Sequence, residues 1–341
     1  MADKNSPLVI RDLKGGRNNV VPPQSLGETE CVEALNVDWF NATFGRKRGG
    51  VASVSLTNTP FTGTISSMAR HVPTSDETAA ELWATDDQGT PKVGRLVGGT
   101  AWATPTIVDV PTGNGWDFTY ASLNGKLFIA YKSGVDRMHC WDPLAATPAI
   151  RRTGLAGTAV PTVADTGSGT YAATLRYYRT RATEQRSGVT THRSEPSTSA
   201  SFTPSGSGTG AVVTHGTLPG EIETHWEVEA STDNASFFRI ATVAIATPTY
   251  TDTAVVTSYA TNPGSAVSGT YTLQKSYKFI ASDQGRILGF GAYTATNPQA
   301  RVEYSAVLGS SDIGDDERVP TGNYQGLDEN DSGVATALFG P

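Results

Sequence analysis

Side chains that commonly perform chemistry are sparse in this sequence of 341 residues. The five histidines have no cysteine or carboxylate at the spacing of metal ligands; they are His71, His139, His192, His215 and His225. Cys31 and Cys140 are too few for a disulfide framework. Catalytic motifs such as Gly-x-Ser-x-Gly, His-Glu-x-x-His and Cys-x-x-Cys do not occur. We predict that the protein is not an enzyme and has no catalytic, cofactor-binding or metal-binding residues, with structural or exposed histidines and buried or incidental thiols.

Three segments have the composition of ligand-binding loops. Residues 206–210 are rich in glycine like a phosphate loop, but no helix follows, so a hairpin tip is favoured. Residues 328–333 match the first half of a calcium loop, yet Phe339 stands where a bidentate Glu is required, which favours a solvated turn. The acidic run 312–317 suits a cation site or a negatively charged channel lining, but an exposed loop is favoured.

Cations and tryptophans offer two further possibilities. Residues 46–48, Arg-Lys-Arg, would touch the phosphates of DNA or pair with acidic groups on an adjoining subunit, and the acidic chain favours the subunit interface. Trp83, Trp102 and Trp116 would stack on sugar rings if exposed, but widely spaced tryptophans in β-sheets usually fill the core.

The composition indicates the framework that carries these residues. Gly, Pro, Thr, Ser, Ala and Val are abundant, as in short strands joined by many turns, so we predict an all-β protein of two or three domains. A net charge of -7 argues against a protein that mainly binds nucleic acid. Residues 1–13 lack the apolar run of a secretory signal, and no stretch approaches the length of a membrane span, so we expect synthesis in a cytoplasm and no membrane anchor.

Turn signals divide the chain into four predicted parts. Residues 1–51 form an extended arm with Pro22-Pro23, followed by the first strands. Residues 52–155 contain short strands at the spacing of propeller blades, including an Asn124-Gly125 hairpin. Residues 156–267 form an insertion, and residues 268–341 resume the blades with a three-stranded unit around the turn 283–285.

The insertion has a different character from the segments on either side. Residues 171–183 alternate with a period of two, and residues 226–231 and 237–243 flank a turn at Asp233-Asn234. About seven short strands in about a hundred residues is typical of an immunoglobulin-like sandwich. The segments 226–233, 238–243 and 249–253 resemble a fibronectin type III domain.

The N-terminal segment contains four short motifs, which are Gly15-Gly16-Arg17-Asn18-Asn19, a Pro-containing stretch, Ala-Leu-Asn-Val-Asp at 34–38 and Gly-Arg-Lys-Arg-Gly-Gly at 45–50. Together they are similar to the opening of bacteriophage tail nozzle and related head-to-tail or tail-tube proteins. The resemblance implies a non-catalytic virion protein of the tail or head-to-tail region. It implies a homo-oligomeric ring around the DNA path, with portal, adaptor or tail proteins as partners and possible host-surface contact through the insertion. Genomic DNA would pass without tight binding.

Two questions stay open at this stage. A propeller needs about four to eight blades, and only two or three are recognisable, so the native chain is longer, the sheet system is open, or a neighbour completes it. The alternative function is a secreted or surface glycan-binding module, or adhesin. A glycosidase ranks third, because no pair of carboxylates is indicated by the sequence.

Overall fold

The structure is a computed structural model. It describes residues 16–17, 30–31, 37–40, 44–47, 59–73, 79–87, 92–97, 101–112, 118–166, 173–205, 210–266, 273, 275–293, 301–307 and 315–326. The chain divides into two compact units, 1–55 and 56–341.

The first unit contains two short strand pairs. Strand β1 (Gly16–Arg17) lies parallel to β2 (Glu30–Cys31), and β3 (Val37–Phe40) pairs antiparallel with β4 (Phe44–Lys47). The β3–β4 pair confirms the first strands predicted at the end of segment 1–51. Pro22-Pro23 lies outside the described residues.

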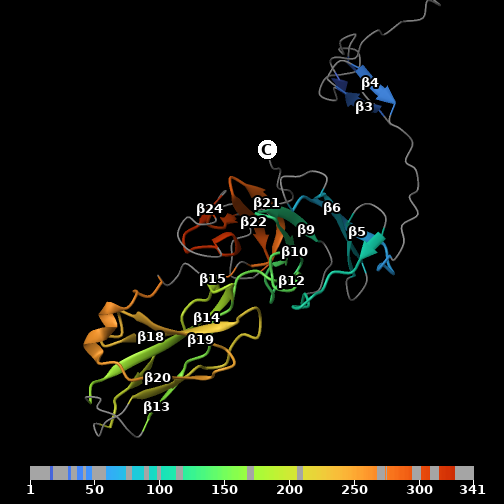
Figure 1. The fold of residues 1–341 in the computed structure, drawn as a ribbon. Coiled ribbons are helices and arrows are strands. Elements are labelled where there is room, and N and C mark those ends of the chain that lie inside the picture. Colours follow the sequence, from blue (N-terminus) through green and yellow to red (C-terminus); the bar gives the residue numbers. More distant parts are fainter. Residues whose placement is uncertain are drawn as a thin grey trace, which may run out of the picture. The chain divides into compact units, whose positions relative to one another are not determined.

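The second unit contains three four-stranded antiparallel sheets in which consecutive strands pair (Figure 1). Sheet I consists of β5 (Ile65–His71), β6 (Glu81–Asp86), β7 (Val93–Val97) and β8 (Ala101–Ala103). Sheet II consists of β9 (Thr119–Leu123), β10 (Lys126–Ala130), β11 (His139–Asp142) and β12 (Ala149–Arg152). Sheet III consists of β21 (Tyr277–Asp283), β22 (Arg286–Ala292), β23 (Arg301–Tyr304) and β24 (Tyr324–Gly326).

Tight two-residue turns set the register of sheets II and III. Asn124 and Gly125 have φ of 51° and 77°, and Gln284 and Gly285 have φ of 46° and 74°. Positive φ at both central residues is the geometry of a type I′ hairpin, whose twist matches that of the strands. The Asn124-Gly125 prediction is confirmed, and so are the first three strands of sheet III.

Sheet II packs between the other two sheets. Leu127 and Ile129 of β10 belong to a buried cluster with Trp83 of sheet I, whereas Phe128 belongs to another with Ile280 of sheet III. Alternate side chains of a strand point to opposite faces, so β10 is covered on both sides. This explains its unbroken apolar run from Leu127 onward.

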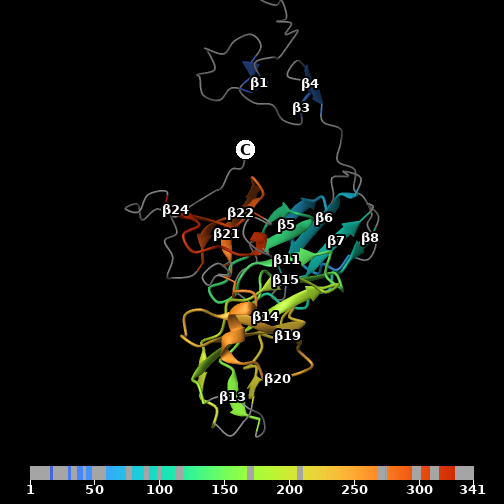
Figure 2. The same ribbon diagram turned by 60° about the vertical axis from the view of Figure 1, so that its left-hand side comes forward.

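The strands between sheets II and III in sequence form a two-sheet sandwich (Figure 2). One sheet has the order β13 (Thr162–Asp165), β17 (Ala211–Thr214) and β20 (Thr249–Asp252). The other has the order β15 (Val189–Arg193), β14 (Arg176–Arg186), β18 (His225–Ser231) and β19 (Phe238–Ala244), and β16 (Ala200–Phe202) also pairs with β14.

The core of the sandwich joins side chains of both its sheets. Tyr178 and Trp226, with no exposed surface, come from one sheet and Val213 from the other, and Tyr259 of the short helix η3 (Val256–Thr261) closes one end. The β18–β19 hairpin confirms the strands predicted around Asp233-Asn234. The strand predicted at 171–183 is β14, which runs on to Arg186.

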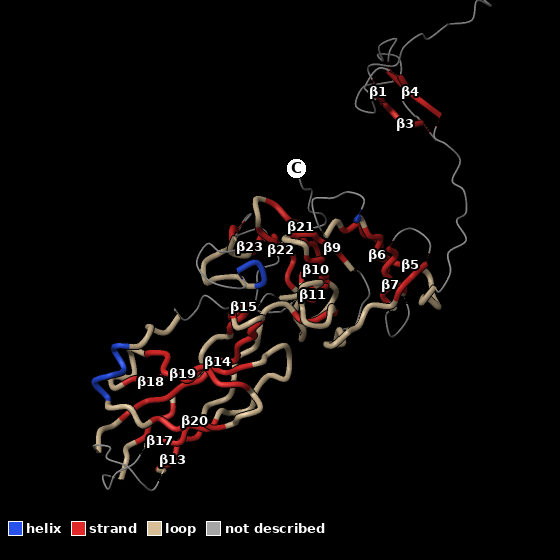
Figure 3. Tube along the Cα trace, viewed as in Figure 1, coloured by secondary structure: helices blue, strands red, loops and turns tan. Residues whose placement is uncertain are grey.

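The whole described chain is nearly all β, and none of its sheets closes on itself (Figure 3). The helical elements η3 and η4 (Asp315–Glu317) are short 3-10 turns. The all-β prediction is therefore confirmed.

Candidate functional site: a buried ionic junction

Charged side chains from three separate parts of the second unit meet in one buried cluster. They come from sheet II, from η4 and from the β14–β15 hairpin of the sandwich. We call this cluster the ionic junction, and it consists of Lys126, Asp142, Arg151, Glu184, Arg186, His192, Asp316 and Glu317.

Arg151 of β12 is the central cation of the junction. Its side chain is 1% exposed, and those of Asp142 and Glu317 are 0% exposed. Arg151 Nη1 donates to Glu317 Oε2 at 2.7 Å, and Nη2 donates to Glu317 Oε1 at 2.8 Å and to Asp142 Oδ2 at 2.7 Å. A planar guanidinium suits this forked geometry, which fixes the direction of approach as well as the charge.

Lys126 of β10 holds the other side of η4. Its Nζ donates to Asp316 at 3.1 Å and to Glu317 at 2.5 Å. Burial alone lowers the pKa of Lys126, but the attraction of Glu317 and Asp316 outweighs burial and the pKa is raised above its ordinary value. Lys126 therefore stays charged inside the protein.

The β14–β15 hairpin carries the sandwich's contribution. Ser187 and Gly188 have φ of 50° and 79° and form its tight turn, and a shift of register between Glu184 and Gln185 then places Glu184 opposite His192. Arg186 reaches from the same hairpin to Asp142 of sheet II at 2.7 Å and to Glu184 at 2.9 Å. The hairpin thus contacts sheet II directly.

His192 bridges two carboxylates. Its Nδ1 lies 2.7 Å from Glu184 Oε2, and its Nε2 lies 3.2 Å from Glu317 Oε1. Burial lowers the pKa of His192, but Glu317 and Glu184 together outweigh it and the pKa is raised. For Glu184 burial acts in the opposite direction and raises the pKa, but His192 and Arg186 outweigh burial and lower the pKa to about 2. Both carboxylates are ionised, because the pKa of Glu317 is also well below its ordinary range.

The junction is better suited to orienting the sandwich than to stabilising the fold. Desolvating buried ion pairs largely cancels their attraction, whereas an unpaired buried charge destabilises by about 3–5 kcal/mol. A misdocked sandwich would leave such charges unpaired. Among the described residues, no group of three or more His, Cys, Asp and Glu has an arrangement that could hold a metal ion.

A second ion pair links the sandwich to the sheets. Arg137, in the loop before β11, donates to Glu221 in the loop before β18 at 2.5 Å and to the carbonyl of Thr153 at 2.6 Å. The backbone of Ala156 also donates to Glu221 at 3.1 Å. These contacts line a cavity of about 480 Å³ with Asp136, Arg152 and Lys275 among its walls. Two sets of contacts therefore hold the sandwich against the sheets.

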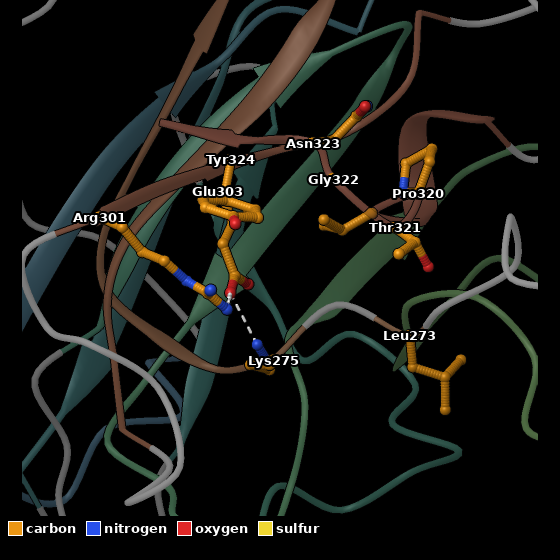
Figure 4. Close-up of a pocket in the computed structure, with 10 residues that line it drawn as sticks. Leu273, Lys275, Arg301, Glu303, Pro320, Thr321, Gly322, Asn323 and Tyr324 are labelled. Atoms are coloured by element: carbon orange, nitrogen blue, oxygen red, sulfur yellow. Dashed lines mark hydrogen bonds and ion pairs between the residues drawn. The ribbon is translucent and has the colours of Figure 1, made fainter. Parts of the chain in front are cut away.

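A smaller cavity of about 240 Å³ lies between β23 and the turn at 319–324 (Figure 4). Lys275 donates to Glu303 at 2.7 Å, and Arg301 donates to the same carboxylate. The guanidinium of Arg301 lies 4.6 Å from the ring of Tyr324, which is 48% exposed. The cavity thus has one aromatic wall and a paired set of charges.

The structure corrects one prediction about the acidic run. Asp316 and Glu317 are fully buried and bound to Lys126 and Arg151, so they belong neither to an exposed loop nor to a negatively charged channel lining. Residues 312–314 lie outside the described residues. An acidic run usually lies in solvent. Here the cations that pair with Asp316 and Glu317 are Lys126 and Arg151, which lie far away in the sequence, so no local pattern predicts the burial.

Several other predictions can be checked against the described residues. Trp83 and Cys140 are buried, as predicted. Trp102 is only partly buried and packs edge-on against Phe61 with ring centroids 4.9 Å apart, so it does not lie in the core as predicted. The glycine-rich segment 206–210 does join two strands of the sandwich, but the predicted hairpin is wrong, because β16 pairs with β14 in one sheet and β17 pairs with β13 and β20 in the other. Residues 206–209 lie outside the described residues. Trp116, Arg48, residues 328–333 and the side chains of Cys31, Arg46 and Lys47 lie outside the described residues.

Sequence reasoning missed the contact between His192 and Glu184. Ser187-Gly188 is a local signal for the hairpin, but regular pairing from this turn would set Glu184 against Thr191. A shift of register between Glu184 and Gln185 brings His192 opposite Glu184, and no sequence pattern predicts that shift. No local signal points to Glu317, which is contributed by a distant part of the chain.

Comparison with known proteins adds no relative: no family model, curated protein or solved structure matches this chain. Within the described residues, no helix has the length and apolar character needed to cross a bilayer.

Proposed function

We propose that this chain is a non-catalytic structural component of a bacteriophage virion, part of the tail or head-to-tail wall around the DNA path. The observation that carries the proposal is the packing of sheets I, II and III face to face, each a four-stranded antiparallel meander. Such sheets are the units of a β-propeller. The nozzle-like opening of the sequence supports the same assignment.

The sandwich supports a fibronectin type III-like insertion. A three-stranded sheet packed on a larger sheet through Trp226, Tyr178 and Val213 is typical of immunoglobulin-like domains. In the sequence, the strands of the sandwich follow sheet II and precede sheet III, as expected for an inserted domain. In the proposed function this domain decorates the outside of the wall and offers a surface for the host.

Charge pairing in the sheets supports a passive wall. Arg95 donates to Glu81 at 2.6 Å, and Arg152 donates to Asp136 at 2.8 Å. Guanidinium groups that are already paired with carboxylates attract phosphate weakly, and the whole chain carries a net charge of -7. These features favour passage of DNA over binding.

The test is to locate the protein in particles. Antibodies against the purified chain, applied to virions from the phage that encodes it, are expected to label the tail or the head-to-tail region in electron micrographs. Native mass spectrometry of the purified protein is expected to show a closed homo-oligomer. Virions that lack the chain by mass spectrometry would overturn the proposal.

A glycan-binding function is the second candidate, and one observation favours it. The half-exposed ring of Tyr324 flanks the cavity of about 240 Å³, which Asn323 and Glu303 also line. Aromatic faces beside polar side chains are suited to sugar rings. Binding to a glycan array that is lost in Tyr324→Ala would favour this function, whereas an array without signal would remove its support.

A further inference from the structure

We propose that the sandwich is fastened to sheet II and η4 by a proton-dependent lock, in which His192 must carry a charge for the joint to close. This inference goes beyond the structural role proposed above, because it gives the protein a joint that responds to pH. The geometry of the imidazole ring and its neighbours carries it.

The ring of His192 lies between two carboxylates. Nδ1 is hydrogen-bonded to Glu184 at 2.7 Å, and Nε2 lies at ion-pair distance from Glu317, 3.2 Å, so a doubly protonated ring is attracted to both sides. A neutral imidazole has one N–H and one lone pair. After loss of the Nε2 proton the ion pair with Glu317 is lost, and the lone pair of Nε2 faces that carboxylate as well as Arg151 Nη2 at 3.5 Å.

The two sides of this bridge belong to different parts of the fold. Glu184 lies on β14 of the sandwich, whereas Glu317 lies on η4, which Lys126 and Arg151 bind to sheet II. Weakening the contact between His192 and Glu317 therefore weakens the joint itself and leaves the sandwich intact.

The charged groups around the ring come from three parts of the fold. From the sandwich these are Glu184 and Arg186, from η4 they are Glu317 and Asp316, and from sheet II they are Arg151, Asp142 and Lys126. Arg151 Nη2 lies 3.5 Å from His192 Nε2, and the buried Arg318 follows Glu317 in the chain. A neutral His192 removes one positive charge from this cluster and leaves its buried carboxylates less compensated.

The direction of the pH response follows from the pKa shifts. The pKa of His192 is raised, so its contribution is present below the ordinary pKa of histidine and is lost as the pH rises through the higher pKa of the closed joint. The carboxyls of Asp142, Glu184 and Glu317 have lowered pKa values and remain ionised over this range. Lys126 keeps its proton because its pKa is raised. The joint is therefore closed below the raised pKa of His192 and opens as the pH rises through it.

The first experiment follows the ring in the full-length protein. Histidine labelled with ¹⁵N reports by NMR whether both ring nitrogens carry protons, and His192→Gln identifies the signal. We expect the ring of His192 to lose its second proton at a pH above the ordinary pKa of histidine, whereas a midpoint at or below that value would overturn the proposal. The titration is followed in the unmodified chain, and the variant serves only to assign the signal.

The second experiment measures opening by hydrogen exchange and mass spectrometry across a pH series. Peptides from the β14–β15 hairpin and η4 should exchange faster with rising pH by up to about tenfold per pH unit beyond the intrinsic increase, because one released proton couples to opening. His192→Gln should show fast exchange at every pH. His225→Gln is the matched control, since His225 bonds Thr224 at 2.9 Å and should behave like the parent protein. Exchange at these peptides that follows only the intrinsic increase would overturn the lock.

Discussion

The buried ring of His139 in sheet II responds to pH in the opposite direction from His192. Its Nδ1 donates to the carbonyl of Arg137 at 3.2 Å, which places the ring proton on that nitrogen. Burial lowers the pKa of His139 from 6.5 to about 4, although Asp136 partly opposes this. His139 is thus neutral in the fold at neutral pH, whereas the pKa of His192 is shifted upward. Acid should therefore destabilise sheet II, whereas alkali should destabilise the ionic junction.

Acid should therefore destabilise the protein through His139. Because the pKa is depressed in the fold, the stability is present above pH 6.5 and is lost as the pH falls toward 4. The difference in pKa corresponds to roughly 3 kcal/mol at most. In His139→Gln the side-chain amide can still donate to the carbonyl of Arg137, but it does not titrate. The free energy of unfolding of this variant, measured with urea from pH 7 to pH 4, should therefore fall less steeply than that of the parent. An acid slope identical to that of the parent would show that His139 is not responsible. His71, whose pKa burial also lowers, should leave a smaller acid slope.

Arg151 provides a prediction about unpaired charge. Arg151→Ala leaves Asp142 and Glu317 buried without their main cation, so we expect a loss of about 3–5 kcal/mol in the free energy of unfolding. Arg239→Ala is the matched control, because Arg239 is 33% exposed and Glu227 keeps Arg193 as a partner. The control should lose less than about 1 kcal/mol. Equal losses for the two variants, measured by denaturant titration, would contradict the role given to Arg151.

At the scale of elements, hairpins are predictable and distant pairings are not. Asn124-Gly125 specifies its turn locally, and the apolar run of β10 marks a buried strand. Strand β24 escapes prediction because its three residues are all exposed and no turn joins it directly to β23. The contact of Arg151 with Glu317 spans 166 residues and leaves no local pattern.

Two glycines in similar turns separate backbone strain from steric contact. Gly125 and Gly188 have φ of 77° and 79°, so alanine is strained at both by about 1 kcal/mol. A Cβ at Gly125 would also lie 2.9 Å from the carbonyl oxygen of Pro73, whereas a Cβ at Gly188 meets nothing within 4 Å. Gly125→Ala should therefore lower the melting temperature more than Gly188→Ala. A larger effect at Gly188 would contradict the close approach to Pro73.

At the scale of the whole molecule, composition predicts the all-β class but not the packing order. Many Gly, Pro and Thr residues indicate strands and turns. The packing of sheet II between sheets I and III depends on Trp83, Phe128 and Ile280 meeting across long separations. Apolar strand residues pack equally well against several partners, so pattern alone does not choose among them.

The acidic chain predicts weak interaction with DNA. Residues 46–48 supply three cations, which release only about three counterions on binding phosphates. We expect no binding of labelled duplex at physiological salt by fluorescence anisotropy. Micromolar binding with a steep salt slope, lost when the three residues become alanine, would replace the passive wall with a nucleic-acid site.

The sandwich should behave as a separate module. Its core unites both sheets through Trp226, Tyr178 and Val213, so residues 156–267 should fold alone and unfold cooperatively. Poor amide dispersion in NMR spectra would contradict this independence.

Separation of the sandwich also changes the surroundings of His192. The isolated module lacks Glu317 and Arg151, so the ring becomes solvated and keeps only Glu184 as a carboxylate partner. Glu317 is the strongest influence that raises the pKa of His192 in the whole chain. The ring should therefore titrate at a lower pH in the module than in the whole protein, as measured by NMR on both. Equal titration midpoints would mean that Glu317 does not hold the proton, and that the joint is fastened by Arg137 and Glu221 instead.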